Sequence, residues 1–224
     1  MNCIIIGLSN FGIELAQQLT DLGHEVLGID ADINKVNLYK DKIKNTICLK
    51  IDGEQAAQSL PLKDADVVFV TIRKDLGASV LIVATLKQAG AKRIIASSIS
   101  GLHSTILQAM GITEIIQPEK EYADYFAQKI DIGSSSFSYK VADNYFIYEA
   151  SLPASFTGRE LKDIAFEKDF GMKLVAIKHL SFASGKSSGK YEIIEKPEEN
   201  YTVAEKDIFI LAGKKRNYIK LMKG

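Results

Sequence analysis

The chain opens with a short apolar run that ends directly in a glycine-bounded turn. Cys3 to Ile6 is followed by Gly-Leu-Ser-Asn-Phe-Gly, Gly7 to Gly12, and a helical pattern starts within this segment. In such turns the first glycine permits the tight bend, the last lets the helix approach the strand, and N–H groups at the helix start bind phosphate. Ser9 replaces the usual middle glycine, and its hydroxyl can donate to a phosphate oxygen. The segment predicts a strand, a phosphate-binding turn and a helix in immediate succession.

Further apolar runs, separated by helical periodicities, follow along the first half of the chain. Near-continuous runs of Val, Ile, Leu and Cys are typical of parallel strands covered on both faces. Strands that alternate with helices predict right-handed crossovers and a Rossmann-type, doubly wound α/β sheet. The expected strands are Cys3 to Ile6, Val26 to Ile29, Thr46 to Leu49, Val67 to Val70 and Ile94 to Ala96.

Apolar stripes and terminal glycines mark the helices of this half. The first helix is expected to pack one stripe against the sheet and to stop at Gly23. Two later helices, Ser79 to Gln88 and Leu102 to Met110, are each followed by a glycine in the same way. The stripe of the first helix consists of Phe11, Leu15, Leu19 and Leu22.

An acidic residue ends the second expected strand, 18 residues after Gly12. In Rossmann-type folds a carboxylate at this place accepts hydrogen bonds from the ribose hydroxyls, and it repels a 2′-phosphate, which disfavours NADP. The alternative is that Asp30 only caps the following helix, a role that Asp32 could also fill. Asp30 is therefore predicted to bind the ribose of a nucleotide.

A second polar segment follows the fourth expected strand. Thr71, Ile72 and Arg73 come directly after Val67 to Val70, at the carboxyl edge of the sheet where open α/β folds place their ligands. Arg73 is predicted to contact a phosphate, with pairing to Asp75 as the alternative.

The pattern of apolar and polar residues changes after residue 117. Pro118 is placed to begin a helix, and its aromatic stripe either closes the local core or crosses to another subunit. The small-residue run 133–136 is predicted to be a flexible connection and the domain boundary. We expect a nucleotide-binding domain at 1–117, a crossover helix and linker at 118–137, and a second domain at 138–224. The aromatic stripe consists of Tyr122, Tyr125, Phe126 and Ile130.

The second domain is predicted to be a small α+β module. Its expected strands are 145–152, 173–177 and 208–212, its expected helix is 159–166, and the Ser/Gly/Lys-rich segment 181–190 is expected to be an exposed hairpin loop.

Composition excludes several classes of function. The 28 basic residues balance the 28 acidic ones, which argues against nucleic-acid binding. No run approaches the roughly 20 apolar residues that cross a bilayer, so we expect a cytoplasmic protein without membrane insertion.

The cysteines and histidines offer no reactive or metal-binding motif. Cys3 and Cys48 are expected to be buried, reduced thiols. The three histidines form no metal-ligand or nucleophile motif, so we expect neither a metal site nor an enzyme.

Together these segments resemble the RCK proteins, cytosolic regulators of potassium transport of the TrkA/KtrA kind, over essentially the whole chain. The resemblance rests on residues 4–12, 23–30 and 65–70, and most specifically on Gly-Ile-Thr-Glu-Ile-Ile-Gln-Pro-Glu-Lys at 111–120. In the second half it rests on 158–163 and 170–177.

The resemblance implies a nucleotide-sensing, non-enzymatic gating subunit of a membrane potassium uptake transporter or channel. Its ligand would be an adenine nucleotide, ATP or ADP first and NAD, NADH or AMP otherwise. It would form homodimers that assemble into a tetramer or an octameric ring, with the crossover helix joining subunits and a membrane potassium-translocating subunit as partner. The alternative is an NAD-dependent oxidoreductase, which would need an acid or base that the second half does not offer.

The resemblance also assigns roles to positions. It places Asp52 near the adenine and Glu119 in a cation or phosphate region, whereas Asn10 and Ser97 stand where ATP-binding members often have arginine and lysine. Glu167 stands where an arginine binds cyclic di-AMP in some relatives, so that ligand is not predicted. The candidate nucleotide-binding residues are Gly7, Leu8, Ser9, Asn10, Phe11, Gly12, Asp30, Ala31, Asp52, Thr71, Ile72, Arg73 and Glu119.

Overall fold

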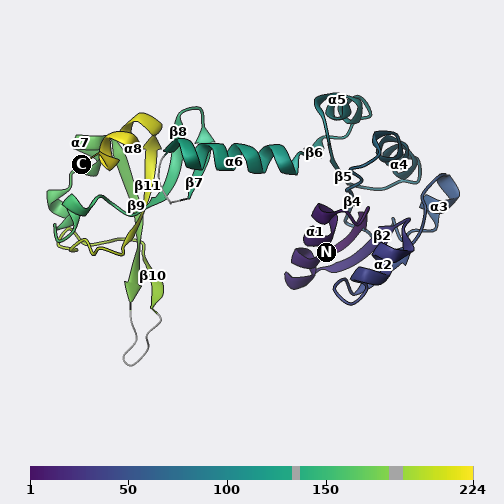
Figure 1. Ribbon diagram of the computed structural model, residues 1–224, viewed down its shortest axis with the longest axis horizontal. Coiled ribbons are helices and arrows are strands. Elements are labelled where there is room, and N and C mark those ends of the chain that lie inside the picture. Colours follow the sequence, from purple (N-terminus) through teal and green to yellow (C-terminus); the bar gives the residue numbers. More distant parts are fainter. Residues whose placement is uncertain (133–136, 182–188, 224) are drawn as a thin grey trace. The chain divides into compact units, whose positions relative to one another are not determined.

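The chain divides into two compact units. The computed structural model describes residues 1–132, 137–181 and 189–223. One unit is Met1–Glu121 and the other is Tyr122–Gly224 (Figure 1). The run 133–136, predicted to be a flexible connection, lies outside the described residues, as do 182–188 of the expected hairpin loop.

A parallel sheet forms the centre of the first unit. Its strand order is β3-β2-β1-β4-β5-β6, so the chain winds outward from β1 in one direction and then from β4 in the other. The predicted Rossmann-type sheet is confirmed, and a sixth strand that was not predicted extends it. The strands are Asn2–Ile6 (β1), Glu25–Asp30 (β2), Asn45–Cys48 (β3), Val67–Val70 (β4), Ile94–Ser97 (β5) and Glu114–Ile116 (β6).

Helices cover both faces of this sheet, because the apolar residues of the strands alternate between two cores. Cys3 and Ile5 belong to one core with residues of the first two helices. Ile4 and Ile6 belong to the other, with residues of the next three. The helices are Asn10–Asp21 (α1) and Ile33–Tyr39 (α2), then Glu54–Gln58 (α3), Leu76–Gln88 (α4) and Gly101–Ala109 (α5).

The first helix presents a different face to the sheet from the one predicted. Its buried residues are Gly12, Ile13 and Ala16, whereas Leu22, a member of the expected stripe, is 72% exposed. Small residues let α1 approach β1 closely, and this contact sets the rotation of the helix. The larger leucines are left at the side, with Leu15 and Leu19 only partly buried.

The environment of one cysteine also differs from the prediction. Cys3 is buried in β1, but Cys48 is exposed. Cys48 ends β3, which lies at the edge of the sheet and is mostly exposed, so an apolar run there did not mean burial. Both thiols are free.

The second unit contains an antiparallel sheet of order β10-β9-β11-β8-β7. Its strands are Ser138–Ala142 (β7), Tyr145–Ala150 (β8), Met172–Ser181 (β9), Lys190–Ile194 (β10) and Ile208–Lys214 (β11), and its helices after α6 (Pro118–Ile132) are Phe166–Phe170 (α7) and Lys215–Met222 (α8). The helix predicted at 159–166 is wrong: this segment contains a 3-10 turn, Leu161–Asp163, and α7 begins where it was expected to end.

Stacked aromatic rings form the centre of this unit's core. Tyr148 on β8 and Tyr218 on α8 have ring centroids 3.9 Å apart, and both are buried. Burial raises the pKa of the Tyr148 phenol well above its ordinary value, with a smaller contribution from Tyr218. These rings belong to a core cluster of the second unit that shares no residue with the two cores of the parallel sheet.

Candidate functional site

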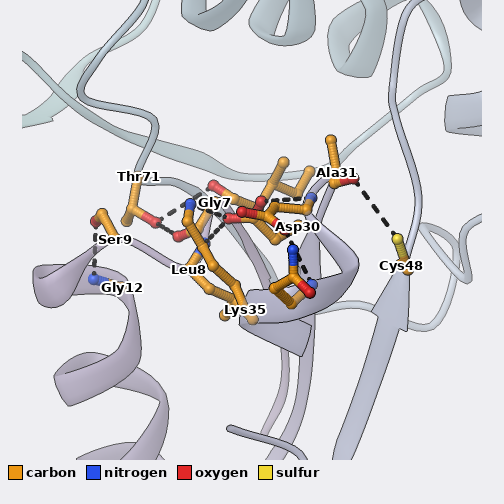
Figure 2. Close-up of polar contacts among 12 residues, drawn as sticks. Gly7, Leu8, Ser9, Gly12, Asp30, Ala31, Lys35, Cys48 and Thr71 are labelled. Atoms are coloured by element: carbon orange, nitrogen blue, oxygen red, sulfur yellow. Dashed lines mark hydrogen bonds and ion pairs between the residues drawn. The ribbon is translucent and has the colours of Figure 1, made fainter. Parts of the chain in front are cut away.

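The glycine turn lies where the winding direction of the sheet reverses, between β1 and β4. Gly7 has a positive φ of 99°, and a Cβ there would lie 2.9 Å from Ile72 Cγ1. A Cβ on Gly12 would lie 2.3 Å from the Gly7 carbonyl oxygen and 2.5 Å from Thr71 Oγ1. Thr71 Oγ1 donates to that carbonyl oxygen at 2.5 Å (Figure 2). Glycine is thus required at both ends of the turn. Thr71, which directly follows β4, holds that end of the strand against the turn.

Ser9 caps the first helix. Its Oγ accepts a hydrogen bond from Gly12 N at 3.2 Å, visible in Figure 2. An accepting hydroxyl keeps its own hydrogen, so Ser9 can cap α1 and still donate to a phosphate oxygen.

Asp30 accepts three hydrogen bonds at the end of β2. Oδ2 accepts from Leu8 N and from Lys35 Nζ, each at 2.8 Å, and Oδ1 accepts from Asp32 N at 2.9 Å (Figure 2). Burial would raise the pKa of this carboxyl, but the hydrogen bonds from Lys35, Asp32 and Leu8 together hold it below its ordinary value. Asp30 is therefore a buried carboxylate that binds the glycine turn directly.

Asp32, and not Asp30, caps the helix that follows. Asp32 Oδ1 accepts from Asn34 N at 2.9 Å at the start of α2. The alternative role considered for Asp30 is therefore wrong. One lone pair on Oδ1 remains for a ribose hydroxyl, whereas a second bond at Oδ2 requires Lys35 to move.

A cavity of about 660 Å³ opens beside the turn, within the range of roughly 300–1,000 Å³ typical of small-molecule sites. Its lining includes every predicted site residue except Gly12, which packs behind the turn. The predicted residues that the structure brings together here are Gly7, Leu8, Ser9, Asn10, Phe11, Asp30, Ala31, Asp52, Thr71, Ile72, Arg73 and Glu119.

Three lysines and several apolar side chains complete the lining, and of these Lys35, Lys50 and the apolar residues were not predicted. Lys35 and Lys50 lie on the β2 and β3 side, and Lys74 lies on the β4 side. The apolar members form a wall suited to a flat ring. They are Ile6, Ile29, Leu49, Ile51, Ala78, Leu81 and Ile82.

Arg73 forms an ion pair that the sequence did not indicate. Its Nη2 contacts Glu119 Oε2, and Glu119 lies in the first turn of α6. Asp75, the alternative partner, instead caps α4 by accepting from Ala78 N at 2.9 Å. The proposed pairing of Arg73 with Asp75 is therefore wrong.

The three histidines of the chain are not among the residues that line this cavity. His103 is buried in α5, where burial lowers the pKa of its imidazole. In the described ranges 1–132, 137–181 and 189–223, no His, Cys, Asp or Glu side chains form a group of three that could hold a metal ion. None of the helices in these ranges has the length and hydropathy of a membrane span.

Residues 3–118 match the TrkA-N domain. The chain belongs to the TrkA-N family. A curated relative, the Ktr system potassium uptake protein C of Bacillus subtilis (strain 168), is 27% identical over 210 residues, which cover 93% of this chain and 90% of that protein. The similarity to this TrkA-N relative therefore extends through both units.

Solved structures share the fold of this TrkA-N protein over its full length. The GsuK RCK domain matches with a TM-score of 0.64 at 13% identity, covering 100% of this chain and 48% of that one. The GsuK channel bound to NAD matches with a TM-score of 0.63 at 13% identity, covering 100% and 39%. The chain thus spans about half or less of those structures, and the RCK fold is confirmed for both units.

Proposed function

We propose that this chain is the nucleotide-sensing regulatory subunit of a membrane potassium transporter or channel. The observation that carries the proposal is the similarity to a potassium uptake protein along 93% of the chain. The same similarity does not favour the oxidoreductase alternative. In this role the protein works at the cytoplasmic face of the membrane through its partner, and it changes ion flux without catalysing a reaction.

The ligand we propose is an adenine nucleotide held in the cavity at the glycine turn. The turn supplies N–H groups and the Ser9 hydroxyl for phosphate, Asp30 accepts from the ribose, and the apolar wall packs on the base. The GsuK channel, which has the same fold, is described as bound to NAD. ATP and ADP remain our first candidates, with AMP and NAD or NADH next.

Potassium flux through liposomes that contain the membrane partner tests this proposal. Addition of the wild-type subunit should make the flux depend on adenine nucleotide, because the ligand stabilises one arrangement of the subunits over another. Asp30→Ala should abolish that dependence. Asp21→Ala, an exposed carboxylate at the end of α1, serves as the matched control, and an unchanged nucleotide response in Asp30→Ala would refute the proposed site.

Self-association is the second part of the proposal. Tyr122, Phe126 and Ile130 on α6 are 65%, 42% and 77% exposed within one chain. Three large apolar side chains on one helix favour a protein contact, and we propose that they join two copies, with dimers assembling into a tetramer or an octameric ring.

Light scattering after size-exclusion chromatography tests the contact on α6. Phe126→Ser combined with Ile130→Ser should lower the molar mass toward the monomer. Leu22→Ser, which changes an exposed leucine directly after the end of α1, should not. A double variant with the wild-type mass would rule out α6 as the interface.

A further inference from the structure

One residue of the cavity lining, Arg73, lies next to the segment that packs against the glycine turn. Arg73 follows directly after Thr71 and Ile72, which pack against Gly7. The backbone that carries Arg73 is therefore held against the glycine turn at the junction between β1 and β4. Arg73 and the turn line the same cavity, so a group bound by the turn lies on the side of the cavity that Arg73 can reach.

Only part of the Arg73 guanidinium has a partner for its N–H groups. Nη2 pairs with Glu119, while Nη1 is buried and has no hydrogen-bond partner anywhere in the described part of the chain. A buried N–H group without an acceptor is unfavourable. Phosphate carries several oxygens that match the fork of a guanidinium, and it binds it more completely than one carboxylate oxygen does.

The partner of Arg73 is easy to release. The Glu119 side chain is 68% exposed, against 20% for Arg73, so water can solvate the carboxylate once the pair opens. Glu119 also lies in the first turn of α6, where the N–H groups of the helix favour a negative charge. Breaking the pair therefore leaves the glutamate in a favourable environment.

We infer that Arg73 is a phosphate-reading switch, paired with Glu119 in this structure and transferred to a nucleotide phosphate on binding. This inference rests on the proposed nucleotide site and adds the residue that distinguishes phosphorylated ligands from adenosine. Transfer frees the first turn of α6 from the cavity. Because α6 continues to Ile132 with its exposed apolar stripe, the phosphate state of the ligand reaches the helix proposed to join subunits.

Calorimetric titration with adenosine, AMP, ADP and ATP tests the switch in the full-length protein. Arg73→Gln should weaken the binding of phosphorylated ligands about tenfold, the effect of losing one charge-assisted contact, and leave adenosine unchanged. Glu119→Gln should strengthen the binding of the same ligands several-fold, since a competitor for Arg73 has been removed. The two variants are thus expected to act in opposite directions.

A second Arg–Glu pair of the same unit provides the control. Arg93 and Glu114 are 2.6 Å apart and do not line the cavity, so Arg93→Gln and Glu114→Gln should bind all four ligands like the wild type. If Arg73→Gln and Glu119→Gln shift affinity in the same direction, or match these controls, the switch is refuted while the nucleotide site stands. If the wild type binds none of the four ligands, the switch is refuted, and if NAD and NADH also fail to bind, the nucleotide site is refuted as well.

Discussion

The close contact between Gly12 and the Gly7 carbonyl predicts that Gly12→Ala lowers the free energy of unfolding. In Gly12→Ala the new Cβ would lie 2.3 Å from a backbone oxygen that β1 holds in place, so no rotamer change relieves the overlap. Overpacking of this kind costs roughly 1–3 kcal/mol, and loss of the Thr71 hydrogen bond adds about 1 kcal/mol. Better helix propensity returns about 1 kcal/mol, which leaves a net destabilisation of about 2 kcal/mol.

Thermal unfolding followed by circular dichroism measures this effect. For a unit of this size about 2 kcal/mol corresponds to a midpoint lower by about 8 °C. Gly101→Ala is the matched control, because Gly101 also lies in the first turn of a helix of this unit and a Cβ there meets nothing within 4 Å. If Gly12→Ala and Gly101→Ala unfold at the same temperature, the close packing of the turn is not what requires glycine.

Two further effects follow from buried carboxylates. The pKa of Asp30 is lowered in the folded chain, so the ionised carboxylate stabilises the fold above its unfolded pKa, and this stabilisation is lost as the pH falls through the folded pKa. In urea titrations the stability advantage of the wild type over Asp30→Asn should therefore shrink below about pH 4. A stability difference that does not change with pH would contradict this. Tyr201 donates to the buried Asp207 at 2.7 Å, so Tyr201→Phe should destabilise the second unit by about 1–3 kcal/mol in urea unfolding, unlike Tyr191→Phe on an exposed side chain; equal stability of the two variants would show that the hydrogen bond contributes nothing.

Sequence reasoning succeeded where the signal is local. The strand, the turn and the helix at residues 2–21 are contiguous, Asp30 is the last residue of β2, and Arg73 comes three residues after the end of β4. Because all strands of a parallel sheet point the same way, these ends meet at one edge whatever the details of packing. Asp30 and Arg73 could therefore be placed at this edge without knowing any contact, whereas Asp52 and Glu119 were assigned to the site from the family resemblance.

The contacts within the site depend on tertiary packing and could not be predicted in this way. Glu119 is 46 positions from Arg73, and their pairing requires β6 and β4 to end at the same edge of the sheet. Likewise the rotation of α1 follows from the small residues Gly12 and Ala16, and its leucines indicated the wrong face. Lys35, in the first turn of α2, carried a weak signal, since a cation there can reach the carboxylate at the end of the preceding strand.

The hydrogen bond from Thr71 to the Gly7 carbonyl joins positions 64 residues apart. Fourteen of the 22 residues that line the cavity come before residue 60 and eight come after it, so neither part of the first unit contains the complete site. A bound nucleotide therefore stabilises the junction of the two parts, and it raises the free energy of unfolding of the whole unit by mass action. Protection from proteolysis on adding ligand should accordingly extend across residues 1–121 and reach well beyond the glycine turn.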